Sequence, residues 1–335
     1  MPDAEQNLRL PKTLYIETTN RCNLRCKGCI LYRGSWEPDR DFSLRELMMV
    51  TDQLPGLEQG YLHGIGEPLL NKELPEIIRH LKGRKVHVLF NSNGILLNRR
   101  RQQELIDAGL DELRISLDAA SSSGYEKIRD GSDFDRIVAN LKSFVALQNR
   151  LQVACPKLSL WFLGTRENIA ELPGFVELSA AIGIGEVYLQ RLVYFQDDRG
   201  YGVARAAETL QDSADGSARL IQESQELAAK LGILFKASGM TKPLESLQGE
   251  AKDSLPWSKC YRPSTLMYIT ANGNVLPCCI APFSTVDYAS IMLGNVFDNP
   301  LEEIWQGFSY EEFRRQHQTR TPPRCCRGCG VQWSL

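Results

Sequence analysis

The chain has 335 residues, 43% of them hydrophobic, and its 39 basic residues nearly balance 41 acidic ones. This size predicts one large domain with a real core plus a small one, and the balanced charge argues against nucleic-acid or membrane-surface binding. The N-terminus lacks an apolar signal segment, and no apolar run approaches the roughly 20 residues that span a bilayer. We therefore expect a soluble cytoplasmic protein that binds neither nucleic acid nor membrane.

The first two-thirds of the chain alternates strand and helix patterns. Expected strands cover residues 14–18, 60–63, 85–91, 112–117, 157–162 and 186–190. Expected helices cover residues 72–82, 99–108, 133–149, 168–181 and 217–231, and a capping box from Ser43 to Glu46 opens a further one. Gly109 and Gly183 stand where helices should end. Six strand–helix repeats predict an α/β fold, a partial (β/α)6 TIM-like barrel with its chemistry at the C-terminal ends of the strands.

The pattern changes near residue 240, which divides the chain into a barrel domain, residues 1–240, and a smaller C-terminal domain, residues 241–335. Polar residues 199–216 predict a loop, and residues 241–256 a linker. Residues 266–270 and 274–276 flank Ala-Asn-Gly, a hairpin signal. Residues 300–315 predict a helix that turns three apolar side chains inward, namely Leu301, Ile304 and Trp305.

Ten cysteines are unusual in such a chain. Without a secretion signal, metal binding or redox chemistry is a better interpretation than a disulfide framework. One group comprises Cys22, Cys26 and Cys29. The second comprises Cys260, Cys278, Cys279, Cys325, Cys326 and Cys329. Cys155 stands apart, and we expect it to be a buried structural thiol.

The first group, Cys22-Asn-Leu-Arg-Cys26-Lys-Gly-Cys29, directly follows the first expected strand. A short loop can wrap three thiolates around one cube of iron and sulfide, which leaves one iron without a protein ligand. Such an open metal position is where a substrate or cofactor binds. A structural zinc would need a fourth ligand, and the nearest histidine in the sequence is His63.

This loop resembles the defining motif of the radical S-adenosylmethionine (SAM) superfamily. The resemblance implies that Cys22, Cys26 and Cys29 hold a [4Fe-4S] cluster whose open iron binds the amino and carboxylate groups of SAM. One electron then breaks a carbon–sulfur bond and normally yields methionine and a 5′-deoxyadenosyl radical. It also implies an electron donor of the flavodoxin or ferredoxin type.

Further positions carry the resemblance at the strand ends. His63-Gly-Ile-Gly66-Glu67-Pro68 matches the family's SAM-amino motif, in which Gly64 and Gly66 allow close approach and Glu67 accepts from the ammonium. The other expected SAM contacts are Asn93, Ser116 (ribose), Arg129 (SAM carboxylate), Asn168 and Gln190. A structural role is an equal alternative for the last three. Gly28 replaces the bulky residue that usually packs beside the adenine, so the adenine's packing partner is left open.

The second cysteine group resembles the SPASM and Twitch accessory domains, which bind auxiliary iron–sulfur clusters. Twelve residues separate Cys260 from Gly273, and four more precede Cys278. Only six residues follow Cys329, so a second auxiliary cluster has no obvious ligands. The resemblance therefore implies a Twitch-type domain with one auxiliary [4Fe-4S] cluster, held by Cys260, Cys278, Cys326 and Cys329. A structural zinc on the same thiolates is the alternative.

Cys279 and Cys325 each adjoin an expected ligand, and the register could favour either neighbour. They are either packed or surface thiols, or candidate catalytic residues that bind a soft substrate. The tail Arg324-Cys-Cys-Arg-Gly-Cys329 resembles that of radical SAM enzymes that form arsinothricin by 3-amino-3-carboxypropyl transfer from SAM to arsenic.

Our main functional prediction is a radical SAM enzyme acting on a small-molecule substrate in natural-product biosynthesis, by dehydrogenation or a related reaction. A fully ligated auxiliary cluster would suit electron transfer in such a reaction. One alternative is aminocarboxypropyl transfer to arsenite. Another is a peptide-modifying maturase, although the short segment before the first strand argues against it. A non-catalytic iron–sulfur sensor would not need the SAM-binding strand ends.

Overall fold

The computed structural model describes residues 9–33, 37–130, 133–194, 204–210, 216–238, 243, 257, 260–285, 288–327 and 329. The loop expected over residues 199–216 and the linker expected over residues 241–256 fall mostly outside the described residues. Within the described part of the chain, no helix is both long and apolar enough to cross a membrane.

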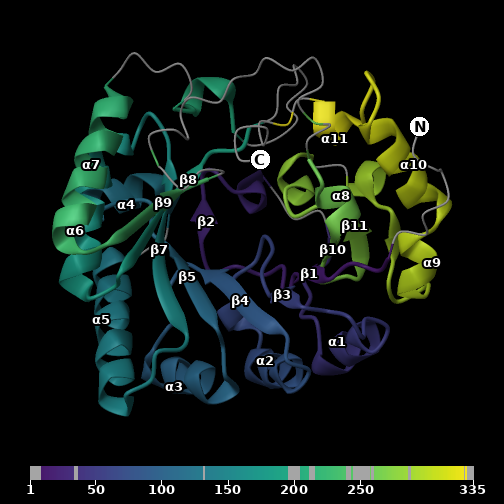
Figure 1. Ribbon diagram of the computed structural model, residues 1–335, viewed down its shortest axis with the longest axis horizontal. Coiled ribbons are helices and arrows are strands. Elements are labelled where there is room, and N and C mark those ends of the chain that lie inside the picture. Colours follow the sequence, from purple (N-terminus) through teal and green to yellow (C-terminus); the bar gives the residue numbers. More distant parts are fainter. Residues whose placement is uncertain are drawn as a thin grey trace.

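One large sheet organises the molecule. In spatial order its strands are β12 (Gly294–Asn295), β11 (Asn274–Leu276), β10 (Leu266–Ile269), β1 (Thr13–Ile16), β3 (Gln59–Tyr61), β4 (His87–Ser92), β5 (Glu112–Ser116), β7 (Lys157–Gly164), β8 (Glu186–Arg191) and β9 (Leu234–Ala237). Every pairing from β10 to β9 is parallel, and β11 and β12 continue antiparallel. The sheet curves without closing, so the fold is the expected TIM-like partial barrel (Figure 1).

Helices cover the outer face of this sheet (Figure 1). The barrel helices are α1 (Leu44–Thr51), α2 (Leu74–Gly83), α3 (Arg99–Ala108), α4 (Ser122–Ile128), α5 (Phe134–Leu151), α6 (Leu172–Ile182) and α7 (Ser217–Leu231). Later in the chain come α8 (Arg262–Thr265), α9 (Leu301–Trp305), α10 (Phe308–His317) and α11 (Arg324–Arg327). The capping box at Ser43 is confirmed, as are the left-handed glycines Gly109 and Gly183 at the ends of α3 and α6.

The inner face of the sheet is polar and aromatic. Along β5, Leu113 and Ile115 are fully buried, whereas Glu112, Arg114 and Ser116 between them are only partly buried. A closed eight-stranded barrel fills its interior with branched apolar side chains. Here the open barrel instead keeps a lumen lined by groups that can contact a ligand.

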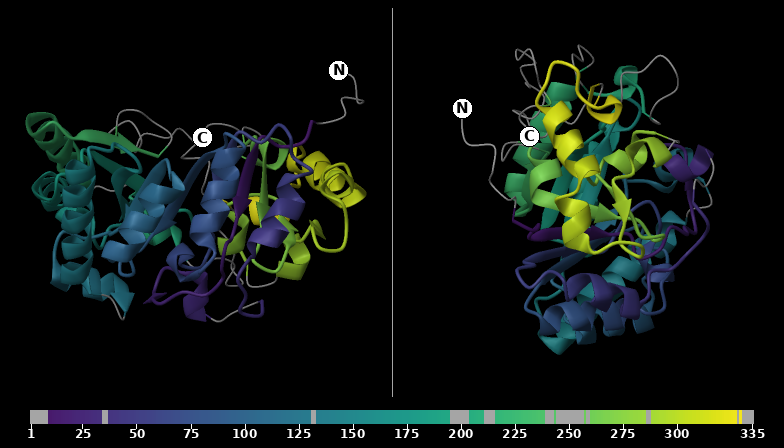
Figure 2. Two further views of the ribbon diagram at one scale, coloured as in Figure 1. Left: turned by 90° about the horizontal axis from the view of Figure 1, so that it is seen from below. Right: turned by 90° about the vertical axis from the view of Figure 1, so that its right-hand side faces the viewer.

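The C-terminal hairpin joins the barrel sheet. Strand β10 pairs in parallel with β1 over its whole length, with Tyr268 opposite Tyr15. Figure 2 shows the green and yellow C-terminal segments at one end of the molecule, beside the purple N-terminal segments and away from α5, α6 and α7. Residues on both sides of the expected boundary near residue 240 can therefore share one cavity.

Several expectations from the sequence need correction. The helix expected over residues 300–315 is two helices, α9 and α10, and Gly307 at the N-cap of α10 separates them. Strand β9 and helix α4 were not predicted. Cys155, expected to be buried, is exposed, because it lies in the surface connection between α5 and β7. Leu301, Ile304 and Trp305 are buried as predicted.

Candidate functional site

A cavity of about 510 Å³ lies at the C-terminal ends of the barrel strands. All three cysteines of the first group line it. So do most of the expected SAM contacts, namely Gly64, Gly66, Glu67, Asn93, Ser116, Arg129 and Gln190. The fold thus brings together residues spread over 169 positions of the chain, from Cys22 to Gln190.

The cysteine loop is held in place by a short pairing beneath the cavity. Strand β2 (Arg25–Cys26) pairs with β6 (Arg129–Asp130), so that Cys26 stands opposite Arg129. The Cys29 N–H donates to the Cys26 carbonyl (3.0 Å), which turns the loop back on itself. Burial raises the pKa of Cys22 to about 12 and that of Cys29 to about 11. Cysteine binds metal as the thiolate, so metal binding would release their protons. Three soft thiol donors facing one cavity fit an iron–sulfur cluster with an open iron.

Gly64 and Gly66 let the loop after β3 approach the loop after β1. A Cβ on Gly64 would lie 2.5 Å from Glu17 Oε1, and a Cβ on Gly66 would lie 2.7 Å from the Arg21 carbonyl oxygen and closer still to that of Thr19. A side chain at Gly66 would thus collide with the backbone, and one at Gly64 with the buried Glu17 side chain, so both positions favour glycine.

Glu67 is buried, and its carboxylate holds the end of β4. Oε1 accepts hydrogen bonds from Ser92 Oγ (2.8 Å) and the Leu69 N–H (3.2 Å), and Oε2 accepts from the Asn93 N–H (2.8 Å). Each carboxylate oxygen has two lone pairs, so Oε2 keeps acceptor capacity toward the cavity. The sequence had predicted only a ligand contact, whereas the structure adds a role in fixing the loop after β4.

Arg129 pairs with Asp118, a cavity residue that the sequence analysis did not select. Arg129 Nε donates to Asp118 Oδ2 (3.0 Å), and Nη2 donates to the same oxygen. Asp118 Oδ1 in turn accepts from the Leu163 N–H (2.8 Å), which locks the pair onto β7. The guanidinium therefore lies between Cys26 and Asp118 and faces the cavity with its charge largely balanced.

Asn168 does not line the cavity, so its expected contact with SAM is not supported. Its amide donates to the Asp118 and Leu163 carbonyls (3.0 and 2.9 Å), and its oxygen accepts from the Thr165 N–H (2.8 Å). Asn168 thus closes the turn after β7, which is the structural role that the sequence analysis gave as the alternative.

Asn93 lines the cavity, and its side chain also donates to Asn23 Oδ1 (2.9 Å) in the cysteine loop.

The lumen also holds aromatic and cationic side chains that motif analysis missed. Tyr15 stacks on Tyr61 with ring centroids 4.1 Å apart, and Trp161 stacks on Tyr188 at 4.0 Å. The Arg114 guanidinium lies 4.7 Å from the Trp161 ring centroid and 5.7 Å from that of Tyr61. The signal that could have found them is their alternation along the strands, since the inward set of each strand recurs every second residue.

His63, in the loop that follows β3, is another cavity residue. Burial, with the nearby Arg114 charge, lowers the pKa of His63 to about 3. The imidazole is therefore neutral at physiological pH. Its Nδ1 accepts from the Asn91 N–H (3.3 Å), so it orients the end of β4.

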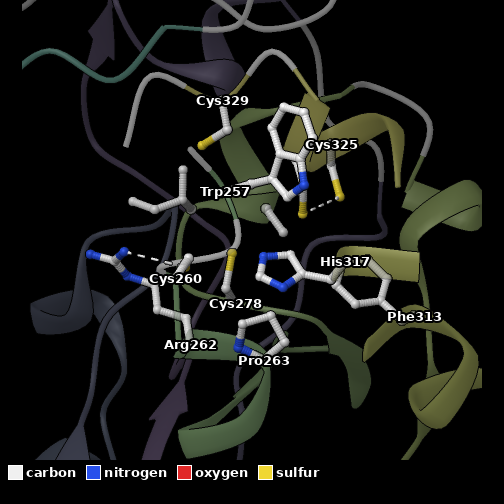
Figure 3. Close-up of a pocket in the computed structure, with 12 residues that line it drawn as sticks. Trp257, Cys260, Arg262, Pro263, Cys278, Phe313, His317, Cys325 and Cys329 are labelled. Carbon is white, nitrogen blue, oxygen red and sulfur yellow. Dashed lines mark hydrogen bonds between the residues drawn. The ribbon is translucent and has the colours of Figure 1, made fainter. Parts of the chain in front are cut away.

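A second, smaller pocket of about 30 Å³ gathers the C-terminal cysteines (Figure 3). Its lining includes the four expected ligands and Cys325 together with Trp257, Pro263, Phe313 and His317. Among the described residues, no three Cys, His, Asp or Glu side chains converge on one metal-ion position. Thiols spaced around a shared apolar pocket fit a cluster, in which each thiolate meets its own iron. Cys325 Sγ lies 3.9 Å from Cys326 Sγ, so five thiols compete for four cluster positions.

The two spare thiols lie in different cavities. Cys325 belongs to the small pocket, whereas Cys279 lines the large cavity, where it lies beside Tyr15 and Arg262. A single soft-ligand site made by Cys279 and Cys325 together is therefore not what the fold builds.

Comparison with known proteins agrees with this geometry. The model of the radical SAM superfamily matches residues 16–178, and that of a SPASM iron–sulfur cluster-binding domain matches residues 260–330. The chain is 23% identical to the tungsten-containing aldehyde ferredoxin oxidoreductase cofactor-modifying protein of Pyrococcus furiosus (94% of this chain, 86% of the relative). It is 22% identical to the PqqA peptide cyclase of Granulibacter bethesdensis (95% of this chain, 79% of the relative).

Among solved structures, Streptococcus suis SuiB bound to the precursor peptide SuiA superposes with a TM-score of 0.67 and 17% identity (97% of this chain, 71% of that chain). The family models imply SAM, a [4Fe-4S] cluster in the barrel and auxiliary iron–sulfur binding in the C-terminal domain. The chain is therefore an enzyme that contains a radical SAM domain, residues 16–178, and a C-terminal SPASM iron–sulfur domain, residues 260–330.

Proposed function

We propose that this enzyme modifies a peptide, with one substrate residue held in the large cavity beside SAM. The observation that carries the proposal is the cavity itself, about 510 Å³ and bounded by both parts of the chain. Arg262, Cys279 and Phe283 from the C-terminal part line it together with residues of the barrel strands. Pockets of roughly 300–1,000 Å³ suit ligands of the size of a cofactor or a small substrate.

The relatives support a peptide over the small molecule that the sequence analysis favoured. One relative spanning most of this chain is named as a peptide cyclase, and SuiB has this fold with a precursor peptide bound. In our proposal residues 1–240 hold SAM, and residues 241–335 hold one auxiliary cluster through Cys260, Cys278, Cys326 and Cys329. A flavodoxin or ferredoxin-type donor stays a prediction.

The chain's own residues would do four things. Cys22, Cys26 and Cys29 would hold the cluster, which supplies the electron that cleaves SAM. Glu67 would accept from the SAM ammonium while it fixes the loop after β4. Ser116 and Gln190 would contact the ribose and the substrate side of SAM. The neutral His63 and the stacked aromatic rings would exclude water from the lumen, where a reactive radical needs protection.

The test is whether the natural substrate is destroyed by a protease. The anaerobically reconstituted enzyme is given SAM, dithionite and a low-molecular-weight fraction of extract from the organism that makes it. We expect the fraction to stimulate 5′-deoxyadenosine formation, and pre-treatment with immobilised protease to abolish that stimulation. A variant with Cys22, Cys26 and Cys29 replaced by Ala supplies the background.

Two results would contradict the proposal. Stimulation that survives protease treatment would restore the small-molecule prediction. Release of 5′-methylthioadenosine on addition of arsenite would favour aminocarboxypropyl transfer, because that reaction breaks a different carbon–sulfur bond of SAM.

A further inference from the structure

The charges lining the large cavity are unequal. Among its described lining residues, Arg114, Arg129, Arg191 and Arg262 face two carboxylates, Glu67 and Asp118. Asp118 is paired with Arg129, and Glu67 is engaged by Ser92 and Asn93. The cationic excess therefore lies with Arg114, Arg191 and Arg262, away from the Asp118–Arg129 pair.

Arg114 and Arg262 stand at opposite ends of one chain of contacts. Arg262 lies beside the Cys279 thiol, which lies beside the Tyr15 hydroxyl. Tyr15 stacks on Tyr61 at 4.1 Å, and Arg114 lies 5.7 Å from the Tyr61 ring centroid. Tyr15 therefore lies between the two guanidiniums, and of the two stacked tyrosines Tyr15 is the one that lines the cavity.

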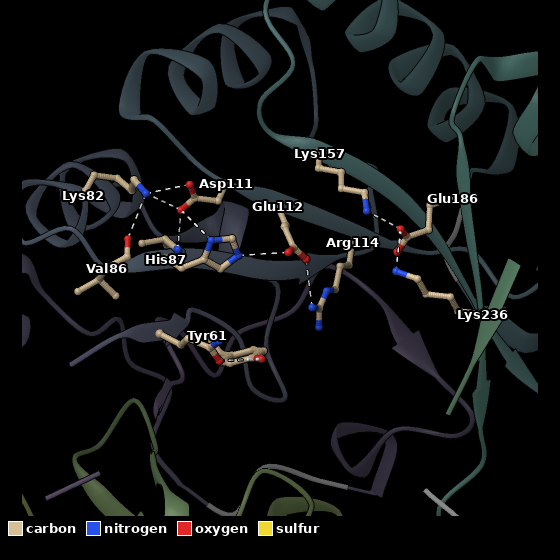
Figure 4. Close-up of polar contacts among 12 residues, drawn as sticks. Tyr61, Lys82, Val86, His87, Asp111, Glu112, Arg114, Lys157, Glu186 and Lys236 are labelled. Atoms are coloured by element: carbon tan, nitrogen blue, oxygen red, sulfur yellow. Dashed lines mark hydrogen bonds and ion pairs between the residues drawn. The ribbon is translucent and has the colours of Figure 1, made fainter. Parts of the chain in front are cut away.

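Among the described residues, neither guanidinium has partners for all of its donors. Arg114 Nη2 donates to Glu112 Oε2 (3.1 Å), a residue outside the cavity lining (Figure 4). Arg262 Nη1 donates to Cys260 Sγ (3.7 Å), and Figure 3 shows its side chain leading away from the centre of the cysteine pocket. A guanidinium carries five N–H donors, so these contacts engage only part of each group. A substrate carboxylate would accept charge-assisted hydrogen bonds from the others.

We propose that the cavity recognises a carboxylate of the substrate, held between Arg114 and Arg262 beside Tyr15. That the carboxylate belongs to a peptide rests on the proposed function. That the cavity binds a carboxylate rests on the cavity alone. The group is either an acidic side chain or the C-terminal carboxylate of the peptide. Arg114 and Arg262 are then specificity-determining residues.

The experiment is calorimetric titration of the reconstituted, SAM-bound protein with three matched probes. N-acetylglutamate methylamide carries a side-chain carboxylate, N-acetylglutamine carries a C-terminal one, and N-acetylglutamine methylamide carries neither. We expect the better carboxylate probe to bind about ten- to a hundredfold tighter than the neutral probe, as charged hydrogen bonds predict. The carboxylate probe that binds tighter shows whether the recognised carboxylate belongs to a side chain or to the C-terminus of the peptide. Equal binding of all three overturns the proposal.

Variants locate the effect. Arg114→Gln and Arg262→Gln should each remove most of the carboxylate preference, while Arg100→Gln, an exposed residue of α3, should keep it. The dissociation constant of SAM should not change in either cavity variant. If it weakens tenfold or more, the arginines serve the SAM carboxylate, and the proposal is wrong. If Arg262→Gln lowers the iron content, it disturbs the auxiliary cluster, and Arg114→Gln alone then tests the carboxylate preference.

Glutarate, a dicarboxylate without a peptide group, separates this inference from the proposed function. If glutarate binds with the same dependence on Arg114 and the N-acetyl probes gain nothing over it, the carboxylate site stands and the peptide substrate does not. If the N-acetylated carboxylate probes bind tighter than glutarate, both stand.

Discussion

Cys278 and Cys279 are adjacent in the chain, yet their side chains line different cavities. Cys278 belongs to the cysteine pocket of the C-terminal domain, whereas Cys279 lines the SAM cavity beside Tyr15. The two cysteines follow β11, and the 3-10 turn Ala281–Phe283 comes directly after them. Ala281 lines the cysteine pocket and Phe283 lines the SAM cavity, so this segment passes between the two cavities. Cys278 is therefore the thiol that we expect to be the cluster ligand.

Iron content should separate these two thiols. We expect about eight irons per chain after anaerobic reconstitution, from two four-iron clusters. Cys278→Ser should lower this to about four, whereas Cys279→Ser should leave it unchanged, as should Cys155→Ser at an exposed site. Iron and acid-labile sulfide assays measure the difference. Loss of four irons in Cys279→Ser alone would instead make Cys279 the ligand.

The first cysteine group should be separable from the second. Replacing Cys22, Cys26 and Cys29 together by Ala should abolish SAM cleavage and leave about four irons in place, because the two sets of thiols line different cavities. Product analysis by liquid chromatography and the electron paramagnetic resonance of the remaining cluster measure both. A triple variant that still cleaves SAM would refute the assignment.

Glu67 should affect SAM binding through its charge and through the loop it holds. Glu67→Ala should weaken SAM binding about ten- to a hundredfold, the loss of a charged hydrogen bond worth roughly 1.5–3 kcal/mol. Ser92→Ala is the matched control, because it removes the 2.8 Å contact to Oε1 and keeps the carboxylate. Equal losses in the two variants would mean that Glu67 acts only by holding the loop. Equilibrium dialysis with SAM distinguishes these outcomes.

Two glycines of the cavity should respond differently to a methyl group. A Cβ on Gly66 would collide with the Thr19 and Arg21 carbonyls, whereas a Cβ on Gly28 would meet no atom within 4 Å. Gly66→Ala should therefore cost about 1–3 kcal/mol of stability, as overpacking does, and weaken SAM binding. Gly28→Ala should change neither. Thermal denaturation with and without SAM measures both effects, and a Gly66→Ala protein as stable as the parent would contradict the close approach.

Glu17 should make stability fall as the pH rises. Burial raises its pKa from 4.5 to about 7, although the N–H groups of Ile65 and Ala271 donate to its carboxylate. A raised pKa means that the folded state favours the protonated acid, so its stabilisation is complete below pH 4.5 and is lost as the pH rises through about 7. Between about pH 6 and 8.5 the free energy of unfolding should fall by about 1–2 kcal/mol.

Glu17→Gln, which cannot ionise, should lack this fall. Glu58→Gln serves as the control, because the Glu58 side chain is 62% exposed. Denaturant unfolding at a series of pH values provides the measurement. Parallel pH profiles for Glu17→Gln and the parent would show that the buried carboxyl does not titrate in this range.

Much of the site could be predicted from the sequence because its signals are local. The spacing of Cys22, Cys26 and Cys29 places three thiols on one short loop. The alternation of strand and helix patterns sets the parallel sheet, whose C-terminal edge collects the residues that follow each strand. Ser43 and Gly109 likewise act through hydrogen bonds and backbone angles within their own helices.

Other features depend on contacts between distant segments, and only the tertiary structure decided them. The Ala271 N–H donates to Glu17, 254 residues away, where β10 lies beside β1, and that pairing brings Arg262 and Cys279 to the SAM cavity. Asn168 turned out to bond backbone carbonyls, because the loop after β7 packs on Asp118. A sequence motif identifies a residue, but the direction of its side chain depends on the segments that pack around it. Those segments are distant in the sequence, so no local pattern predicts them.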